Sequence, residues 1–187
     1  SYTPTYIMKA LADHPVLASA LVGLFHALHD PSIPDSARKI NKWNDAINSG
    51  LEAVKILDQD RIIRFVKSLI DATLRTNFYQ RDEQGQPKPV LSIKFDSAKI
   101  AYLPDPRPWR EIFVYSPRME GIHLRAGKIS RGGIRWSDRP EDFRTEILGL
   151  MQAQQVKNAV IVPDGAKGGF ILKKLPEGAT REATQAE

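Results

Sequence analysis

Residues 130–170 read SRGGIRWSDRPEDFRTEILGLMQAQQVKNAVIVPDGAKGGF and decide how the rest of the chain is interpreted. Two glycine pairs, at positions 132–133 and 168–169, bracket a segment with helical character. Asp138 with Glu141 resembles a capping box, and Pro140 suits a first helical turn, so a helix is predicted to run to about Lys157. Beyond this helix, the run Val160-Ile161-Val162 predicts a short buried strand.

Cationic side chains recur beside the two glycine pairs. Glycine removes side chains where a ligand needs close backbone approach, and Arg131, Lys157 and Lys167 supply positive charge for an anionic substrate. Gln154 lies one turn before Lys157 on the same helix face, so both can reach one carboxylate. Taken singly, each glycine pair also fits a plain tight turn, and Lys157 also fits a solvated residue at a helix C-terminus. Together they predict that Lys157 and Lys167 converge on one cleft.

Lys167 is the residue expected to carry chemistry. Between Ala166 and Gly168, after a buried strand, its amine can be desolvated and crowded by other cations, and both effects lower the pKa of a lysine. Asp164 would raise that pKa by pairing with Lys167, or it can point to solvent instead. The interpretation is a lysine that passes protons near neutral pH.

The combination of these motifs resembles the substrate domain of glutamate dehydrogenases. The shared pieces are Arg-Gly-Gly-Ile-Arg at 131–135, Gln154 to Asn158, a short strand at 159–163 and a Gly-x-Lys-Gly-Gly catalytic loop at 165–169. Within the glutamate dehydrogenases, this sequence is more similar to the large bacterial NAD-specific class, and that resemblance runs from about residue 61 to residue 170. The segments LRTNFYQ, EIFVYSPRMEG and RWSDRPEDFRTEILGL extend that likeness.

The resemblance implies an oxidoreductase of amino-acid catabolism that deaminates L-glutamate oxidatively to 2-oxoglutarate and ammonia with NAD. It assigns catalysis to one residue, Lys167. It assigns substrate binding to Arg131, Gly132, Gly133, Gln154 and Lys157, with Gln154 and Lys157 on the α-carboxylate. Arg131 stands where smaller-subunit enzymes carry a lysine that holds the side-chain carboxylate, which favours a dicarboxylate substrate.

The chain contains no G-x-G-x-x-G motif, so NAD is expected to bind to a domain absent from this chain. The chain opens on Ser1 rather than methionine and is interpreted as a fragment of a longer enzyme. The fragment alone is expected to be inactive, and the parent is expected to be a homo-oligomer. The sequence does not distinguish NAD from NADP or identify allosteric effectors.

The composition limits the classes of protein to consider. The 187 residues carry a formal charge of +5 without a dense basic tract, which fits an acidic substrate and gives no sign of a nucleic-acid or membrane partner. Cysteine is absent, which excludes disulfides, thiolate catalysis and cysteine-ligated zinc. The four histidines form no convincing metal motif. No signal peptide or membrane span is evident, so a cytoplasmic location is the default expectation.

The first part of the chain predicts helices. One runs from Pro15 to about His29, and a second, capped by Ser36, carries an apolar face through Ile40, Trp43, Ile47, Leu51 and Val54. A third opens at Asp58 or Asp60, with an apolar stripe predicted to continue to Phe78. Residues 1–84 are therefore predicted to form a helical segment.

The hydrophobic period changes after the polar loop at 81–88. Strands are predicted at 90–95, 111–116 and 121–126, the last two as a hairpin. The predicted fold class is α+β or α/β: a helical N-terminal segment followed by a small mixed β-sheet with flanking helices, as in an incomplete substrate domain of amino-acid dehydrogenases. Residues 85–187 would form that substrate-binding part, truncated before the dinucleotide-binding domain.

Two other functions fit parts of the sequence. An anionic-ligand or nucleic-acid binding module would use the basic and aromatic residues Lys128, Arg131, Arg135, Trp136, Arg139 and Arg144, although the acidic Glu141, Asp142 and Glu146 are interspersed among them. A non-catalytic helical assembly domain would use the N-terminal helices and leave the glycine-rich segment vestigial.

Overall fold

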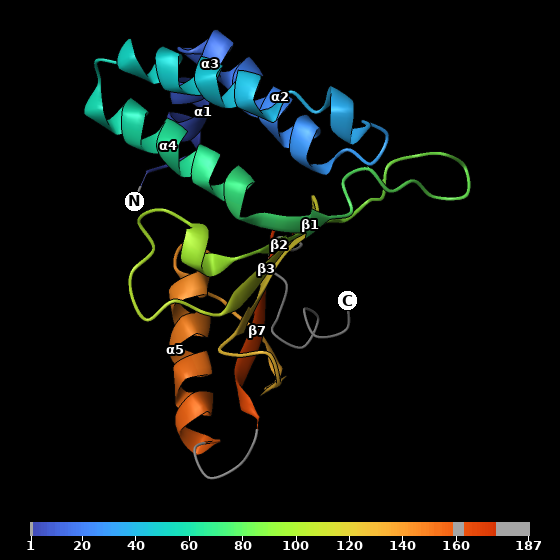
Figure 1. The fold of residues 1–187 in the computed structure, drawn as a ribbon. Coiled ribbons are helices and arrows are strands. Elements are labelled where there is room, and N and C mark those ends of the chain that lie inside the picture. Colours follow the sequence, from blue (N-terminus) through green and yellow to red (C-terminus); the bar gives the residue numbers. More distant parts are fainter. Residues whose placement is uncertain (1, 159–162, 175–187) are drawn as a thin grey trace. The chain divides into compact units, whose positions relative to one another are not determined.

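The chain folds into two compact units in the computed structural model, which describes residues 2–158 and 163–174 (Figure 1). The first unit contains residues up to Arg75 together with Ala98–Asp105. The second contains Thr76–Ser97 and the described residues from Pro106 onward. Each unit has its own hydrophobic core. The domain boundary predicted between residues 84 and 85 stays a prediction.

Four helices form most of the first unit. They are α1 (Pro4–Ala12), α2 (Pro15–His29), α3 (Ile40–Glu52) and α4 (Leu57–Ala72), with a short 3-10 helix at Asp35–Ala37. Their buried apolar side chains meet in one cluster: Leu17, Ala20, Leu21, Leu24, Ile47, Leu51 and Ile63. Among the described residues, no single helix is long and apolar enough to cross a membrane. Helices α1 and α2 reach that length and apolar composition only when taken together, and this pair is bent by 101°.

The α2–α3 contact depends on two glycines, one on each helix. A Cβ at Gly23 of α2 would lie 2.6 Å from the Trp43 ring of α3. A Cβ at Gly50 of α3 would lie 2.6 Å from the Leu17 side chain of α2. Each helix therefore gives up one side chain so that a large apolar side chain of its partner can pack against the backbone.

The helix from Pro15 to His29 is confirmed, whereas three predicted helix boundaries are wrong. Ser36 lies in the 3-10 helix and does not cap α3, whose N-cap is Lys39 without a side-chain hydrogen bond. The helix predicted to open at Asp58 or Asp60 begins at Leu57 and ends at Ala72 rather than near Phe78. It ends because Thr73 turns to extended backbone and donates its hydroxyl to the Leu69 carbonyl.

Residues 2–158 and 163–174 contain five helices and a mixed seven-stranded sheet, which confirm the predicted α+β fold class. The strands are β1 (Thr73–Thr76), β2 (Leu91–Phe95), β3 (Arg110–Tyr115), β4 (Met119–Arg125), β5 (Ser130–Arg131), β6 (Ile134–Trp136) and β7 (Asp164–Leu172). Their order is β1-β2-β3-β4-β7-β5, with β6 also on β7. A second 3-10 helix spans Ser97–Lys99. The predicted hairpin is confirmed as the antiparallel pair β3–β4.

Strand β7 pairs with three other strands of the sheet. It pairs antiparallel with β4 on one side and parallel with β5 and β6 on the other. Arg131 of β5 pairs with Gly165, and four residues later Arg135 of β6 pairs with Gly169, so the two short strands share one register. The prediction of a glycine-rich loop at 165–169 is therefore wrong, because these residues form the middle of strand β7.

Helix α5 (Phe143–Lys157) runs alongside β7, as the orange helix and red strand in Figure 1 show. Its buried side chains Phe143, Ile147 and Met151 pack with Ile122, Leu124 and Ile171 of the sheet. The helix start predicted at Asp138 is wrong, because the N-cap is Asp142, which pairs with Arg139 and makes no capping hydrogen bond. The predicted strand at Val160-Ile161-Val162 lies outside the described residues.

Two glycines of β7 allow α5 to lie against the strand. A Cβ at Gly165 would lie 2.6 Å from the Gln155 nitrogen and 2.7 Å from the Met151 oxygen, both in the α5 backbone. A Cβ at Gly169 would overlap the Ile147 side chain. The helix backbone cannot move aside as a side chain can, so only glycine fits at position 165.

Gly165→Ala is therefore expected to lower the free energy of unfolding by about 1–3 kcal/mol, the usual cost of overpacking a core. Gly149→Ala is the matched control, because a Cβ at Gly149, on α5 itself, meets nothing within 4 Å. That substitution should raise the free energy of unfolding by about 0.5–1 kcal/mol through helix propensity. Urea unfolding of the two variants measures both values, and equal effects would contradict the packing argument.

Candidate functional site

Lys167 lies at the centre of β7 and is partly exposed. Its antiparallel partner is Leu124 of β4, which is completely buried in the cluster beneath α5. Its strand neighbours two positions away are Gly165 and Gly169, whose Cβ positions both meet α5. Because side chains two positions apart leave the same face of a strand, Lys167 projects on the α5 side of the sheet.

The same alternation places Arg131 and Arg135 on this face. Arg131 pairs with Gly165 and Arg135 pairs with Gly169 in parallel register, and partners in register share a face. Arg135 supports the assignment directly, since its Nε lies 3.0 Å from Glu146 Oε1 on α5. The structure therefore brings Arg131, Arg135 and Lys167 to one side of the sheet, along adjacent strands.

The four paired glycines have different surroundings. A Cβ at Gly132 would overlap the Ala166 carbonyl of β7, and one at Gly168 would lie 2.9 Å from Ile134. The space that a Cβ at Gly169 would need is occupied by the Ile147 side chain. At Gly133 the nearest atom is Lys167 Nζ, 3.8 Å away, so space is open there. Three glycines thus serve internal packing, and Gly133 leaves room beside the lysine amine.

The C-terminal turn of α5 reaches β7 through side-chain amides. Gln154 Nε2 donates to Asn158 Oδ1 at 2.9 Å, and Asn158 Nδ2 donates to the Asp164 carbonyl at 3.2 Å. Gln155 binds the same strand end, since its Oε1 accepts from the Gly165 amide and its Nε2 donates to Asp164 Oδ1. Gln154 is therefore joined to the strand through Asn158. Lys157 is exposed, and its side chain makes no hydrogen bond with the part of the chain that is described, so its convergence with Lys167 stays a prediction.

Asp164 is partly exposed, and its carboxylate has partners other than Lys167. Its carboxylate accepts from Gln155 at 3.0 Å, and a Cβ at Gly127 would overlap its Oδ2. Within residues 2–158 and 163–174, no ion pair joins Asp164 to Lys167. The carboxylate is used to hold the end of α5 and the turn at Gly127.

The charges of this region divide into two groups. Seven basic residues lie from Arg131 to Lys173. Four of them form ion pairs with carboxylates: Arg135 with Glu146, Arg139 with Asp142, Arg144 with Glu111 and Lys173 with Glu120. The other three, Arg131, Lys157 and Lys167, have no carboxylate partner among the described residues. These three are the cations that the sequence singled out.

The ion pairs also bear on the nucleic-acid alternative. Of its basic residues, Arg135, Arg139 and Arg144 are engaged by carboxylates, and the Arg144–Glu111 contact has two hydrogen bonds of 2.7 Å. Such bidentate pairs hold the guanidinium in a fixed orientation. Glu111, Asp142 and Glu146 therefore neutralise much of the proposed basic surface.

Glu146 has a position that sequence reasoning missed. Its Oε2 accepts from Ser137 Oγ at 2.7 Å, and its Oε1 contacts Arg135 by charge without hydrogen-bond alignment. Ser137 is buried and donates its amide to the Phe170 carbonyl of β7. Glu146 thus ties α5 to β6 and to the residue that follows it. The only signal in the sequence was that Glu146 lies in the acidic run after Trp136.

His123 of β4 lies on the opposite face of the sheet. It pairs with Gly168, and its Cδ2 would lie 3.2 Å from a Cβ there. Burial lowers the pKa of His123, and the positive charge of Arg125 lowers it further. The described residues contain no group of three His, Cys, Asp or Glu side chains able to hold a metal ion.

Comparisons with known proteins show the family to which this chain is similar. A family model described as "Bacterial NAD-glutamate dehydrogenase, catalytic domain" matches residues 46–187. The chain belongs to this family. The match covers α5, all strands from β1 onward and every predicted site residue.

Three similar relatives are each named NAD-specific glutamate dehydrogenase. The protein of Pseudomonas aeruginosa is 54% identical over 97% of this chain, that of Halomonas elongata 53% over 97%, and that of Mycobacterium tuberculosis 51% over 100%. The aligned region makes up only 11–12% of the length of these relatives. The resemblance to this class of glutamate dehydrogenase is therefore confirmed at the level of the family.

The different surroundings of Gly132 and Gly133 give a prediction. Gly133→Ala adds a methyl group in open space and should change the free energy of unfolding by less than about 0.5 kcal/mol. Gly132→Ala forces a methyl group into the β7 backbone and should cost about 1–3 kcal/mol. Urea unfolding measures both values. A loss at Gly133 as large as that at Gly132 would show that no free space lies beside Lys167.

Proposed function

We propose that this chain supplies the substrate-carboxylate site and the catalytic lysine of an NAD-dependent glutamate dehydrogenase, which converts L-glutamate to 2-oxoglutarate and ammonia by oxidative deamination. The observation that carries the proposal is the pattern of charge neutralisation. In the segment from Arg131 to Lys173, the described carboxylates neutralise four cations and leave Arg131, Lys157 and Lys167 without a partner. A substrate with two carboxylates supplies the missing negative charge.

Each residue has a separate part in this proposal. Arg131, on the α5 face, binds the side-chain carboxylate of glutamate through its two-pronged guanidinium. Gln154 and Lys157, at the end of α5, bind the α-carboxylate. Gly133 leaves the space beside Lys167 in which the α-carbon lies, and Gly132 lets the backbone approach β7 closely enough to form that space.

Lys167 acts as the general acid-base. After the α-carbon has been oxidised to the iminium, water must add to that carbon before ammonia can leave. The amine of Lys167 removes a proton from the attacking water and, as an ammonium ion, stabilises the negative charge that develops on oxygen. The packing of β7 against α5 and β4 fixes the backbone position from which the side chain of this lysine extends.

The residues of this chain do not fit a dinucleotide. The sequence has no G-x-G-x-x-G, and the glycines of β7 are occupied by α5 and β6 rather than opening a helix N-terminus. We propose that NAD is held by residues outside positions 1–187. Residues 1–187 alone would then not turn over glutamate. A homo-oligomeric parent and a cytoplasmic location remain predictions.

Lys167→Met tests the catalytic role in the intact enzyme, meaning a polypeptide of its relatives' length that carries this chain. The substitution keeps length and apolar bulk but removes the amine, so turnover should fall by about 100-fold or more. Lys157→Met should instead raise the KM for glutamate, because a carboxylate contact made equally in the ground and transition states affects binding. Steady-state kinetics separate the two outcomes, and near-normal turnover in Lys167→Met would remove the proposed role.

Arg131→Leu tests the choice of a dicarboxylate substrate. Loss of a charge-assisted hydrogen bond should lower kcat/KM for glutamate by about 10- to 100-fold, with a much smaller effect on a neutral amino acid of similar length. Lys128→Leu is the control, since it removes the same charge from an exposed position just before β5. Equal losses on both substrates would argue against a contact between Arg131 and the side-chain carboxylate.

A further inference from the structure

A cavity of about 660 Å³ lies within the first unit, away from all the residues discussed above. Its walls come from the start of the chain, from α1, from α4 and from the segment Ala98–Asp105. The volume falls in the range of sites for small organic ligands, which are mostly apolar with a few polar groups at fixed positions. Its lining has this composition, because apolar side chains and three aromatic rings surround a single arginine.

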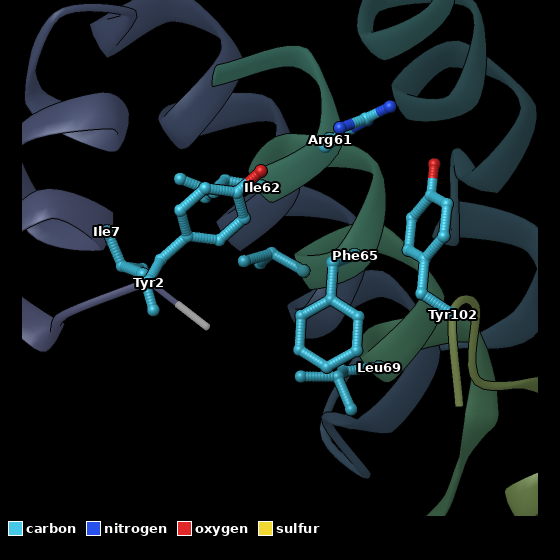
Figure 2. A pocket seen from close by; sticks show the side chains of 8 residues that line it. Tyr2, Ile7, Arg61, Ile62, Phe65, Leu69 and Tyr102 are labelled. Carbon is cyan, nitrogen blue, oxygen red and sulfur yellow. The ribbon is translucent and has the colours of Figure 1, made fainter. Parts of the chain in front are cut away.

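Three aromatic rings line this cavity. Figure 2 shows the rings of Tyr2, Phe65 and Tyr102 facing the same space, with Leu69 below them. In the same view, the hydroxyl groups of Tyr2 and Tyr102 and the guanidinium of Arg61 lie towards one end. The cavity is therefore amphipathic: its polar groups gather at one end, which forms a polar rim, and apolar side chains line the rest.

Tyr102 is held at this rim in an unfavourable backbone conformation. It is the one non-glycine residue with positive φ in the described chain, at 61°, yet 63% of it is exposed. The segment around it is anchored, because Ile100 is buried and the Ala101 amide donates to Ser68 Oγ of α4 at 3.0 Å. Strained residues are often kept where a ligand is bound. Here the strain places an aromatic ring at the cavity mouth without burying it in the core.

Arg61 is the one cation of α4 that forms no ion pair with a described carboxylate. The other two cations of this helix pair with carboxylates one turn away, Arg64 with Asp60 and Lys67 with Asp71. The neighbouring carboxylate, Asp58, accepts from the Tyr2 hydroxyl at 2.8 Å. This hydrogen bond raises the pKa of Tyr2, while Arg61 acts in the opposite sense and so lies close to the same hydroxyl. Among the described residues, no carboxylate forms an ion pair with Arg61.

We propose that this cavity binds a small amphipathic anion, a carboxylate on a flat apolar body, as a second site separate from the glutamate site. The apolar body lies between the rings of Phe65 and Tyr102, and the carboxylate lies at the rim beside Arg61. Charge complementarity favours this occupant, since no described carboxylate forms an ion pair with Arg61 and an anion can supply that charge.

The test uses 2-naphthoate and its uncharged analogue 2-naphthamide, titrated calorimetrically into the intact enzyme. One naphthoate should bind per chain, about tenfold more tightly than the amide. Arg61→Gln should abolish this preference and leave amide binding unchanged. Lys67→Gln is the matched control, because it removes one charge from the same helix at a side chain already paired with Asp71, and it should keep the preference.

A second variant separates binding from folding. Asn adopts the left-handed conformation more readily than Tyr, so Tyr102→Asn should fold at least as stably as the wild type. It should weaken both probes by about three- to tenfold through loss of the ring. A charge preference that survives Arg61→Gln would overturn the proposal. Absence of naphthoate binding to the intact enzyme, as when another segment of polypeptide fills the cavity, would overturn it equally.

Discussion

The second unit depends on how closely α5 lies against β7. The contact is between main chains at Gly165, where a helix nitrogen and a helix carbonyl occupy the volume that any side chain would need. This separation lets Gln155 and Asn158 reach the strand directly, and it brings Glu146 to the end of β6. Glycine is unfavourable in a strand, so the strand must be stabilised by its neighbours. Pairing with β4 on one side and with β5 and β6 on the other supplies that stabilisation.

A site built this way keeps its cations apart from the carboxylates of its own fold. Three carboxylates close in sequence or space to the proposed site are already bound. Asp164 accepts from Gln155, Glu146 contacts Arg135 and Ser137, and Glu111 binds Arg144. A carboxylate that is held elsewhere cannot compete with a substrate carboxylate for the free cations. The polar network around the site therefore maintains its electrostatic character as well as its shape.

Periodicity predicted the parts of the fold in which it is strongest. The apolar spacing of Leu17, Leu21 and Leu24 gave α2, and the alternating residues around Pro117 gave the β3–β4 hairpin. Helix starts were less predictable, because Ser36 and Asp138 have capping chemistry, but Ser36 lies in a separate 3-10 helix and Asp138 lies in a bend before α5. The strand character of β7 could not be predicted from Gly-Ala-Lys-Gly-Gly, since it comes from tertiary pairing rather than from local preference. The site cations could be named from the sequence, whereas the neutralisation of their neighbours required the three-dimensional arrangement.

The common register of β5 and β6 on β7 has a consequence for how this region can change in length. Both strands keep the same alignment although Gly132 and Gly133 interrupt the pairing between them. Inserting or deleting one residue at this break would shift one strand relative to the other, and a one-residue shift reverses which face each side chain leaves. Arg131 and Arg135 would then project from opposite faces of the sheet. A single extra residue would therefore have to be absorbed as a bulge between β5 and β6 if both arginines are to stay on the face that carries Lys167.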